Sequence, residues 1–177
     1  KVVDYLKKKR EKINFCLVGE PTNPNKLGEM IKIGRRGSLT GKIVINGIQG
    51  HVAYPQRANN PSTTIVEILK KLKDIKFDNG TKNFQKTNLE VTRININNHI
   101  DNVIPSYAEA TFNIRFNNKH SSNSLKKKLN AILTRICRKK KTKYKIEYKV
   151  SGEAFFCKPN SFVYKIQNII KKNTKIK

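Results

Sequence analysis

Residues 34–55 read GRRGSLTGKIVINGIQGHVAYP, and the middle of this stretch predicts a β-strand. Leu39, Ile43 and Ile45 alternate there with polar side chains, which is the pattern of a strand with one buried face. Glycine-rich polar segments precede and follow the alternation, and such segments mark turns and loops. The stretch therefore predicts one half-buried strand with polar groups at both ends.

The polar residues on either side of this strand are candidates for a site. Arg35, Arg36 and Ser38 come before it, and guanidinium groups match the geometry of a carboxylate. His51 comes after it, between a glycine and a Tyr-Pro pair. The residues alone favour a carboxylate-binding cluster before the strand, and they leave open whether His51 is functional or structural.

The rest of the chain outlines an α+β domain around this strand. Apolar residues at helical spacing predict two helices, and alternating patterns predict three more strands. The expected elements are strands near residues 38–46, 89–96, 107–116 and 144–150 and helices near residues 60–75 and 121–136. Their β-α-β-β-α-β order is that of ferredoxin-like domains, in which we expect two helices to cover one face of a four-stranded antiparallel sheet. Arg115 is expected on the strand face that points away from the core.

Further elements are expected near both ends of the chain. Residues 2–12 and 161–172 predict helices, and the apolar run of residues 13–18 is typical of a buried parallel strand. Glu20 would then lie at the carboxyl end of a strand, where open α/β sheets bind their ligands. The local sequence leaves two roles open for Glu20, a metal ligand or a cap of the following turn.

The composition is strongly basic, and this raises the question of nucleic acid. The formal net charge is +26, with 38 Lys and Arg against 12 Asp and Glu. The basic residues are 30 lysines and only 8 arginines, spread along the whole chain. Arginine is the side chain preferred for reading base edges and for gripping phosphates. We therefore interpret the charge as a solvated surface, with binding of a polyanion as the alternative.

The cysteines and the apolar segments indicate the compartment. Cys16, Cys137 and Cys157 have the spacing of neither a disulfide framework nor a zinc finger. Free thiols are typical of the reducing cytoplasm. No apolar run approaches the roughly 20 residues that span a bilayer. We therefore expect a cytoplasmic protein without a membrane partner.

Six short motifs resemble those of one enzyme family. They are CLVGEPT at residues 16–22, GRRGSLT at 34–40, GIQGHVAYP at 47–55, DNVIP at 101–105, FNIRF at 112–116 and SGEAF at 151–155. Their order and intervals are similar to those of the zinc-dependent M20 amidohydrolases and peptidases, and within these to the succinyl-diaminopimelate desuccinylases. The resemblance extends from about residue 15 to the last expected helix.

The resemblance implies a domain organisation. M20 enzymes have a two-zinc catalytic domain into which a βαββαβ lid, which is also the dimerisation domain, is inserted. On this basis residues 1–37 and 153–177 are expected to belong to the catalytic domain, and residues 38–152 to form the lid. The implied partners are a second copy of the chain, joined through the lid, and a small dicarboxylate substrate. No specific nucleic acid is implied.

The resemblance also implies roles for individual residues. Glu20 matches a zinc ligand, in a full enzyme that holds two zinc ions per subunit and can take cobalt instead. His51 resembles the lid histidine that reaches the partner subunit's active site and stabilises the oxyanion there. The implied substrate-binding residues are Arg35, Ser38, Tyr54, Asn102 and Arg115.

The reaction implied is hydrolysis of the amide of N-succinyl-LL-2,6-diaminopimelate to succinate and LL-diaminopimelate, a precursor of lysine and peptidoglycan. The family's other metal ligands and its general base lie in an HxDxxP motif, a Glu-Glu pair and a later histidine. None of these occurs in the 177 residues. We therefore expect this sequence to be an internal fragment that is inactive by itself.

Two other interpretations remain open. The chain could come from another M20 amidohydrolase, such as an acetylornithine deacetylase or an aminoacylase-like enzyme; the paired arginines and Ser38 favour the desuccinylase, because its substrate carries several carboxylates. A more remote alternative is a basic ferredoxin-like module that binds RNA on its sheet. Such modules stack bases on exposed aromatic rings, and the outward face of residues 107–116 offers only Tyr107.

Overall fold

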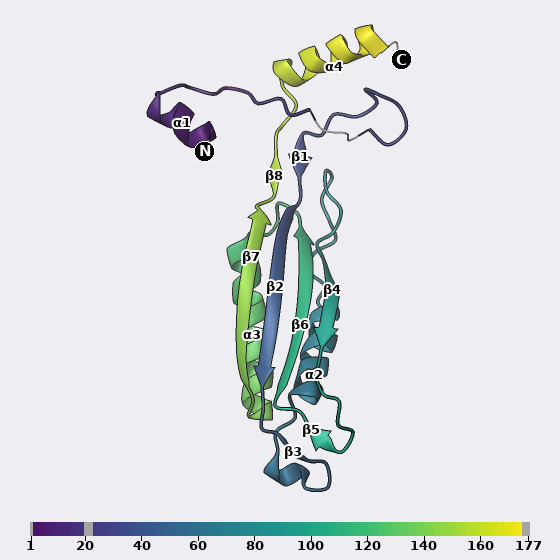
Figure 1. Cartoon of the computed structure of the whole chain (residues 1–177). Helices are drawn as coiled ribbons and strands as arrows, with labels where there is room; N and C mark the ends of the chain where they lie inside the picture. The colour runs from purple at the N-terminus through teal and green to yellow at the C-terminus, as the bar shows by residue number, and fades with distance from the viewer. Residues whose placement is uncertain (1, 20–22, 175–177) are drawn as a thin grey trace. The chain divides into compact units, whose positions relative to one another are not determined.

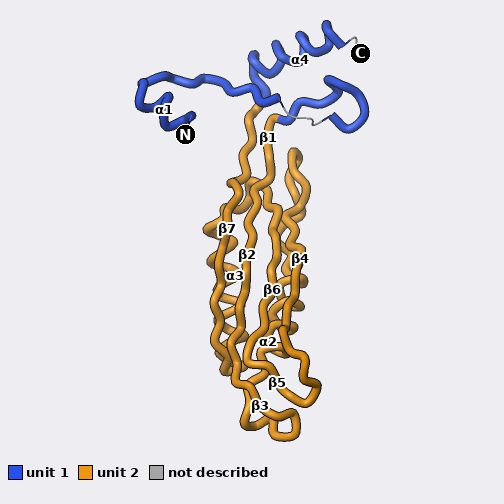
Figure 2. Tube along the Cα trace, viewed as in Figure 1, with its two compact units in different colours: residues 1–32, 159–177 blue, residues 33–158 orange. Residues whose placement is uncertain are grey.

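The computed structural model describes residues 2–19 and 23–174 (Figure 1). The described chain forms two compact units, one comprising residues 33–158 and the other built from segments 1–32 and 159–177 (Figure 2). The expected division into catalytic segments and a lid is a statement about function, and it stays a prediction. The larger unit carries most of the candidate site residues, so its architecture decides how they are placed.

The larger unit is a four-stranded antiparallel sheet covered on one face by two helices (Figure 1). Its strands are β2 (Gly37–Asn46), β4 (Asn88–Asn95), β6 (Tyr107–Phe116) and β7 (Lys143–Gly152), in the spatial order β4-β6-β2-β7. Its helices are α2 (Pro61–Lys73) and α3 (Ser122–Lys140). The predicted α+β, ferredoxin-like βαββαβ fold is therefore confirmed.

The alternating patterns of β2 and β6 produce the core. Gly37 to Asn46 pair with Phe116 to Tyr107 without interruption, so the two strands share one buried face. That face carries Leu39, Ile43, Ile45, Ala108, Ala110, Phe112, Ile114 and Phe116, each fully buried. Gly41 lies opposite Phe112, and a Cβ at residue 41 would overlap with the ring of that phenylalanine. The other face of the sheet, which no helix covers, is polar and is called the open face below.

Local sequence signals set the bounds of the helices. Asn60 caps α2 by accepting a hydrogen bond from Ser62 N, and Pro61 occupies the first turn. Ser121 and Ser124 form a reciprocal capping box at the start of α3, which ends where Lys141 adopts a left-handed conformation (φ 55°). The register of β4 shifts between Val91 and Arg93, so this strand contains a β-bulge.

Two short strand pairs extend the unit at opposite ends of β2. β1 (Gly34–Arg35) pairs with β8 (Phe155–Phe156) next to the start of β2. β3 (Gly50–His51) pairs with β5 (Val103–Ile104) beyond its end, followed by the short 3-10 helix η1 (Pro55–Arg57). The segment before β2 and the segment after it are thus held at opposite ends of one sheet (Figure 1).

The smaller unit contains α1 (Val2–Lys8) and α4 (Ser161–Thr174). Phe15 stacks on Phe162 with ring centroids 4.3 Å apart. The strand predicted for residues 13–18 is wrong, because these residues are exposed and form neither helix nor strand. A strand needs a hydrogen-bonded neighbour, and none of the described segments pairs with them. Among the described residues, no helix combines the length and the apolar character of a membrane span.

A buried carboxylate ties the α2–β4 loop to the start of α3. Asp78 accepts hydrogen bonds from Gly80 N at 2.6 Å, from Asn117 Nδ2 at 2.7 Å and from Thr87 N at 3.2 Å. His120 Nε2 lies 3.1 Å from Asp78 Oδ2. Burial alone would raise the pKa of Asp78, but the hydrogen bonds from Thr87, Asn117 and Gly80 outweigh it and hold the pKa well below its ordinary value.

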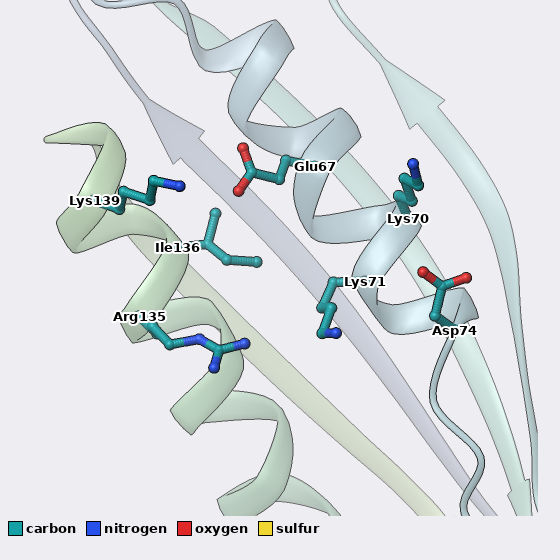
Figure 3. Close-up of a pocket in the computed structure, with 7 residues that line it drawn as sticks. All are labelled: Glu67, Lys70, Lys71, Asp74, Arg135, Ile136 and Lys139. Atoms are coloured by element: carbon teal, nitrogen blue, oxygen red, sulfur yellow. The ribbon is translucent and has the colours of Figure 1, made fainter.

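The helical layer of the larger unit is strongly basic. Helix α2 carries three lysines and one glutamate, and α3 carries seven Lys and Arg and no acidic residue. A groove of about 430 Å³ runs between the two helices, where Lys71 and Arg135 extend from opposite walls (Figure 3). Lys128 and Lys126 lie over the rings of Phe77 and Tyr148, and both rings are partly buried.

The Asp78 network predicts a pH-dependent contribution to stability. Asp78→Asn should lower the free energy of unfolding by about 2 kcal/mol at pH 7, since it replaces a charged acceptor by an amide. A lowered native pKa stabilises the fold above the unfolded pKa of about 3.9, and the contribution is lost as pH falls below it. Urea denaturation from pH 3 to pH 8 should show a gap between native protein and variant that narrows below about pH 4. The exposed Asp101→Asn serves as control, and equal stability of Asp78→Asn and the native protein at pH 7 would refute the account.

The charge predicts weak, nonspecific binding of nucleic acid. Only counterion release drives it, so affinity should fall steeply and linearly on a log–log plot against salt. Fluorescence anisotropy with two labelled RNAs and two labelled DNAs of unrelated sequence should give affinities that differ little among the four. Selective binding of one sequence that survives about 0.15 M salt would instead support a nucleic-acid-binding module.

Candidate functional site

The predicted site residues of the larger unit fall into two clusters. The base cluster, next to the start of β2, consists of Arg35, Ser38 and Arg115. The tip cluster, beyond the end of β2, consists of His51, Tyr54 and Asn102. Because β2 has ten residues, the two clusters are about 30 Å apart.

The tip cluster is organised by the β3–β5 pair. His51 faces Val103 in this pair, and Val52 N donates to Asn102 O at 3.0 Å, which holds the two loops together. The side chains of His51 and Asn102 consequently meet, with Nε2 and Nδ2 3.4 Å apart. All three members of the cluster are exposed, so the group projects from the end of the sheet rather than packing into the core.

The hydrogen bonds of His51 decide which ring nitrogen can donate. Ala53 N donates to Nδ1 at 3.1 Å, so Nδ1 is an acceptor and the proton of the neutral ring is on Nε2. Nε2–H and the Asn102 amide are then two neighbouring donors. Two donors so close together suit an oxygen atom that gains negative charge, as in an oxyanion hole.

Tyr54 and Arg57 complete the tip. The ring of Tyr54 lies 6.0 Å from that of His51, and its backbone N–H donates to His51 O at 2.9 Å. Arg57 lies over the ring of Tyr54, with its guanidinium carbon 5.4 Å from the ring centroid. Arg57 was not predicted from the sequence, although its position three residues after Tyr54 in a Pro-containing turn is a usable signal.

The base cluster lies on the open face and at the β1–β8 pair. Ser38 and Arg115 are register partners, Ser38 being 7% exposed and Arg115 exposed. Gly152 is the β7 partner of Ser38, and a Cβ there would overlap with the guanidinium of Arg35. The predicted outward direction of Arg115 is confirmed, and Ser38 lies between Arg115 on β6 and Gly152 on β7, beside which the Arg35 guanidinium lies.

Arg36 has a different environment from Arg35. Its Nη1 donates to Asn88 Oδ1 at 3.1 Å and to Lys86 O at 3.3 Å. The Arg36 guanidinium therefore binds the first residue of β4, Asn88, which is also the register partner of Arg115. Arg35 and Arg36 were both candidates for binding a carboxylate, and Arg36 instead stabilises the start of β4.

An ion pair between Lys42 and Glu109 lies on the open face between the two clusters. Glu109 is 7% exposed, accepts a hydrogen bond from the Tyr107 hydroxyl and pairs with Lys42 Nζ at 2.9 Å. The Tyr107 and Lys42 contacts lower the pKa of Glu109. This carboxylate stays ionised and paired with Lys42, so the two side chains together carry no net charge.

The residues that the structure describes do not make a zinc site. Glu20, the predicted ligand, lies outside the described residues. In the ranges 2–19 and 23–174 no group of three or more His, Cys, Asp and Glu side chains comes together. Protein zinc sites use three or four such ligands. The described residues therefore do not fit a zinc centre.

Comparison with known proteins identifies relatives. Residues 33–141 match the model of the peptidase dimerisation domain of the M20 group. The chain is 70% identical over all 177 residues to the succinyl-diaminopimelate desuccinylase of Pelagibacter ubique (strain HTCC1062), covering 46% of that protein. It is 44% identical over 176 residues to the enzyme of the same name from Rickettsia bellii (strain OSU 85-389), covering 45% of it. The chain thus spans about half the length of these relatives.

Solved structures share the fold at low sequence identity. A tripeptidase from Staphylococcus aureus gives a TM-score of 0.67 at 14% identity, over 82% of this chain and 37% of the other. An aminopeptidase from Bacillus cereus gives 0.64 at 11% identity, over 80% and 36%. The family match over residues 33–141, which contain all of the tip cluster and all of the base cluster, shows that the chain belongs to the M20 peptidase dimerisation domain family.

Proposed function

We propose that the chain serves as the lid and dimerisation segment of an amidohydrolase that cleaves N-succinyl-LL-2,6-diaminopimelate to succinate and LL-diaminopimelate. The names of the relatives from Pelagibacter ubique and Rickettsia bellii support this substrate. The base cluster supports it chemically, because two guanidinium groups beside a hydroxyl suit a substrate with several carboxylates. The three free cysteines agree with an enzyme of the reducing cytoplasm.

The separation of the two clusters is the observation that carries the proposal furthest. A small substrate cannot bridge about 30 Å, so the tip and base of one subunit cannot act on the same molecule. A two-fold axis between two antiparallel lids places the tip of each beside the base of the other. In such a homodimer each active site takes its base cluster from one subunit and its tip cluster from the partner.

The sheet edges offer a way to form this dimer. β4 and β7 are the outer strands of the four-stranded sheet, and their outward backbone groups lack a strand partner among the described residues. Exposed edges pair readily with another chain. An isologous contact satisfies the same backbone groups on both subunits. We therefore propose that the lids join edge to edge.

The clusters have separate tasks in the proposed reaction. His51 Nε2–H and the Asn102 amide donate to the carbonyl oxygen as it becomes an oxyanion, and one such donor is worth roughly 2.7–4 kcal/mol in comparable sites. Tyr54 orients His51 through its ring and its backbone contact. Arg35, Ser38 and Arg115 bind the substrate carboxylates. The metal, two zinc ions per subunit or cobalt in their place, is proposed to be held outside the described residues, with Glu20 as one ligand.

The shared site can be tested by mixing subunits of a hybrid enzyme. In the hybrid, residues 1–177 replace the matching stretch of the Pelagibacter ubique relative, to which they are 70% identical. His51→Ala should lower kcat about 100-fold and leave dimerisation unchanged, because the donor acts only in the transition state. Arg115→Ala should weaken substrate binding. Random mixing of these two parents should restore about a quarter of the native activity, since half of the dimers regain one intact site.

Mixing His51→Ala with Asn102→Ala is the matched control. Both changes lie in the tip cluster, so every site of that mixed dimer keeps one defect and no activity should return. If the first mixture forms mixed dimers but stays inactive, the trans arrangement is wrong. If the unmutated hybrid hydrolyses an acetylated amino acid better than the succinylated substrate, the proposed substrate is wrong.

A further inference from the structure

Asn113 contacts the base cluster from the neighbouring position on β6. Its register partner on β2 is Thr40, and its side chain shares the open face with Arg115, two residues further along the strand. The amide Nδ2 donates to Ser38 Oγ at 3.2 Å and to Thr40 Oγ1 at 2.9 Å. Both amide protons are thus directed at hydroxyl oxygens of β2.

This contact fixes what Ser38 can do. A serine hydroxyl has one proton and two lone pairs. Because Asn113 donates to Ser38 Oγ, one lone pair is occupied and the proton must point elsewhere. Within residues 2–19 and 23–174, the Ser38 O–H donates to no acceptor atom, although Ser38 is only 7% exposed. A nearly buried donor without an acceptor is costly, so a partner is expected for it.

The neighbours of Ser38 indicate the chemistry of that partner. Arg115 lies across the strand pair, and Arg35 lies against Gly152 on the other side. Guanidinium groups can only donate, and these two lie at the neighbouring strands β6 and β7, on either side of a hydroxyl that is also left to donate. Asn88, the β4 partner of Arg115, has its Oδ1 occupied by Arg36. Ser38, Arg35 and Arg115 therefore present donors and cations, which bind a carboxylate more strongly than a neutral amide and repel an ammonium group.

We propose that Asn113 is a positioning residue that turns the Ser38 hydroxyl into a dedicated donor for a substrate carboxylate held by Arg115 and Arg35. This rests on the proposed function of the base cluster and adds a residue to it. Asn113 does not touch the carboxylate itself. It acts through Ser38, so its effect on binding disappears when that hydroxyl is removed.

The test measures binding of succinate to the chain by calorimetry and by NMR, without any hydrolysis. Succinate should bind the 177-residue chain with a Kd of about 1–10 mM, and the neutral isostere succinamide should not bind. Ser38→Ala and Asn113→Leu should each weaken succinate binding about fivefold. The double variant should bind succinate no more weakly than either single variant, because both changes act on the same hydrogen bond, the one from Ser38 to the carboxylate.

Asn130→Leu is the matched control, since Asn130 accepts a hydrogen bond from the Tyr148 hydroxyl (2.9 Å) on the helix-covered side of the sheet. It should leave the Kd for succinate unchanged. If Asn113→Leu does not fold, Asn113→Ala takes its place with the same expected Kd. Failure of succinate to bind, native affinity in the Asn113 variant, or a double variant weakened by the product of both single effects would each overturn the proposal. Inactivity of the hybrid enzyme would count against the proposed reaction and leave this binding result standing.

Discussion

The length of β2 is the constraint on which the interpretation of this molecule depends. Ten uninterrupted backbone pairs join β2 to β6, and β7 pairs along its other edge, so the strand is held straight through the centre of the sheet. The segments before and after it are anchored by the β1–β8 and β3–β5 pairs. Two groups of polar residues are thereby kept about 30 Å apart in a part of the fold that cannot bend to bring them together. A single catalytic centre that uses both groups has to be assembled from two subunits.

Both clusters are built to donate hydrogen bonds, and in each the direction of donation is set by a neighbour. At the tip, Ala53 N–H occupies His51 Nδ1, so Nε2 is the ring nitrogen that can donate. At the base, Asn113 occupies Ser38 Oγ and leaves the hydroxyl proton free. Donors fixed in advance cost no reorganisation when charge develops or when an anion binds. We propose that the positive charge of the base cluster binds an anion, while the lysines of α2 and α3 lie on the other side of the sheet.

Most of the fold of the larger unit can be predicted from the sequence, but only part of the candidate site can. Alternation in residues 37–46 and 107–116, together with the capping signals at Asn60 and Ser121, is sufficient to predict the sheet and its helices, because these patterns record which face is buried. The apolar run 13–18 has no such support, since apolar residues alone do not say whether a neighbouring strand exists. Arg36 and Asn113 could not be assigned from the sequence, because their roles depend on contacts with Asn88 and Ser38 across the sheet. The separation of Ser38 from His51, by contrast, follows from the length of the strand between them.

The distance between a tip and a base in adjoining subunits tests the central claim most directly. Nitroxide labels at Val52 and Ser151, both exposed, mark the tip and the base in a background from which the three native cysteines have been removed. Pulsed electron paramagnetic resonance on dimers of the hybrid enzyme, with one label on each subunit, gives the distance between subunits. Dimers with both labels on one subunit give the distance within it, about 30 Å or more. The account predicts a clearly shorter distance between subunits than within one. An intersubunit distance equal to or longer than the internal one would contradict it.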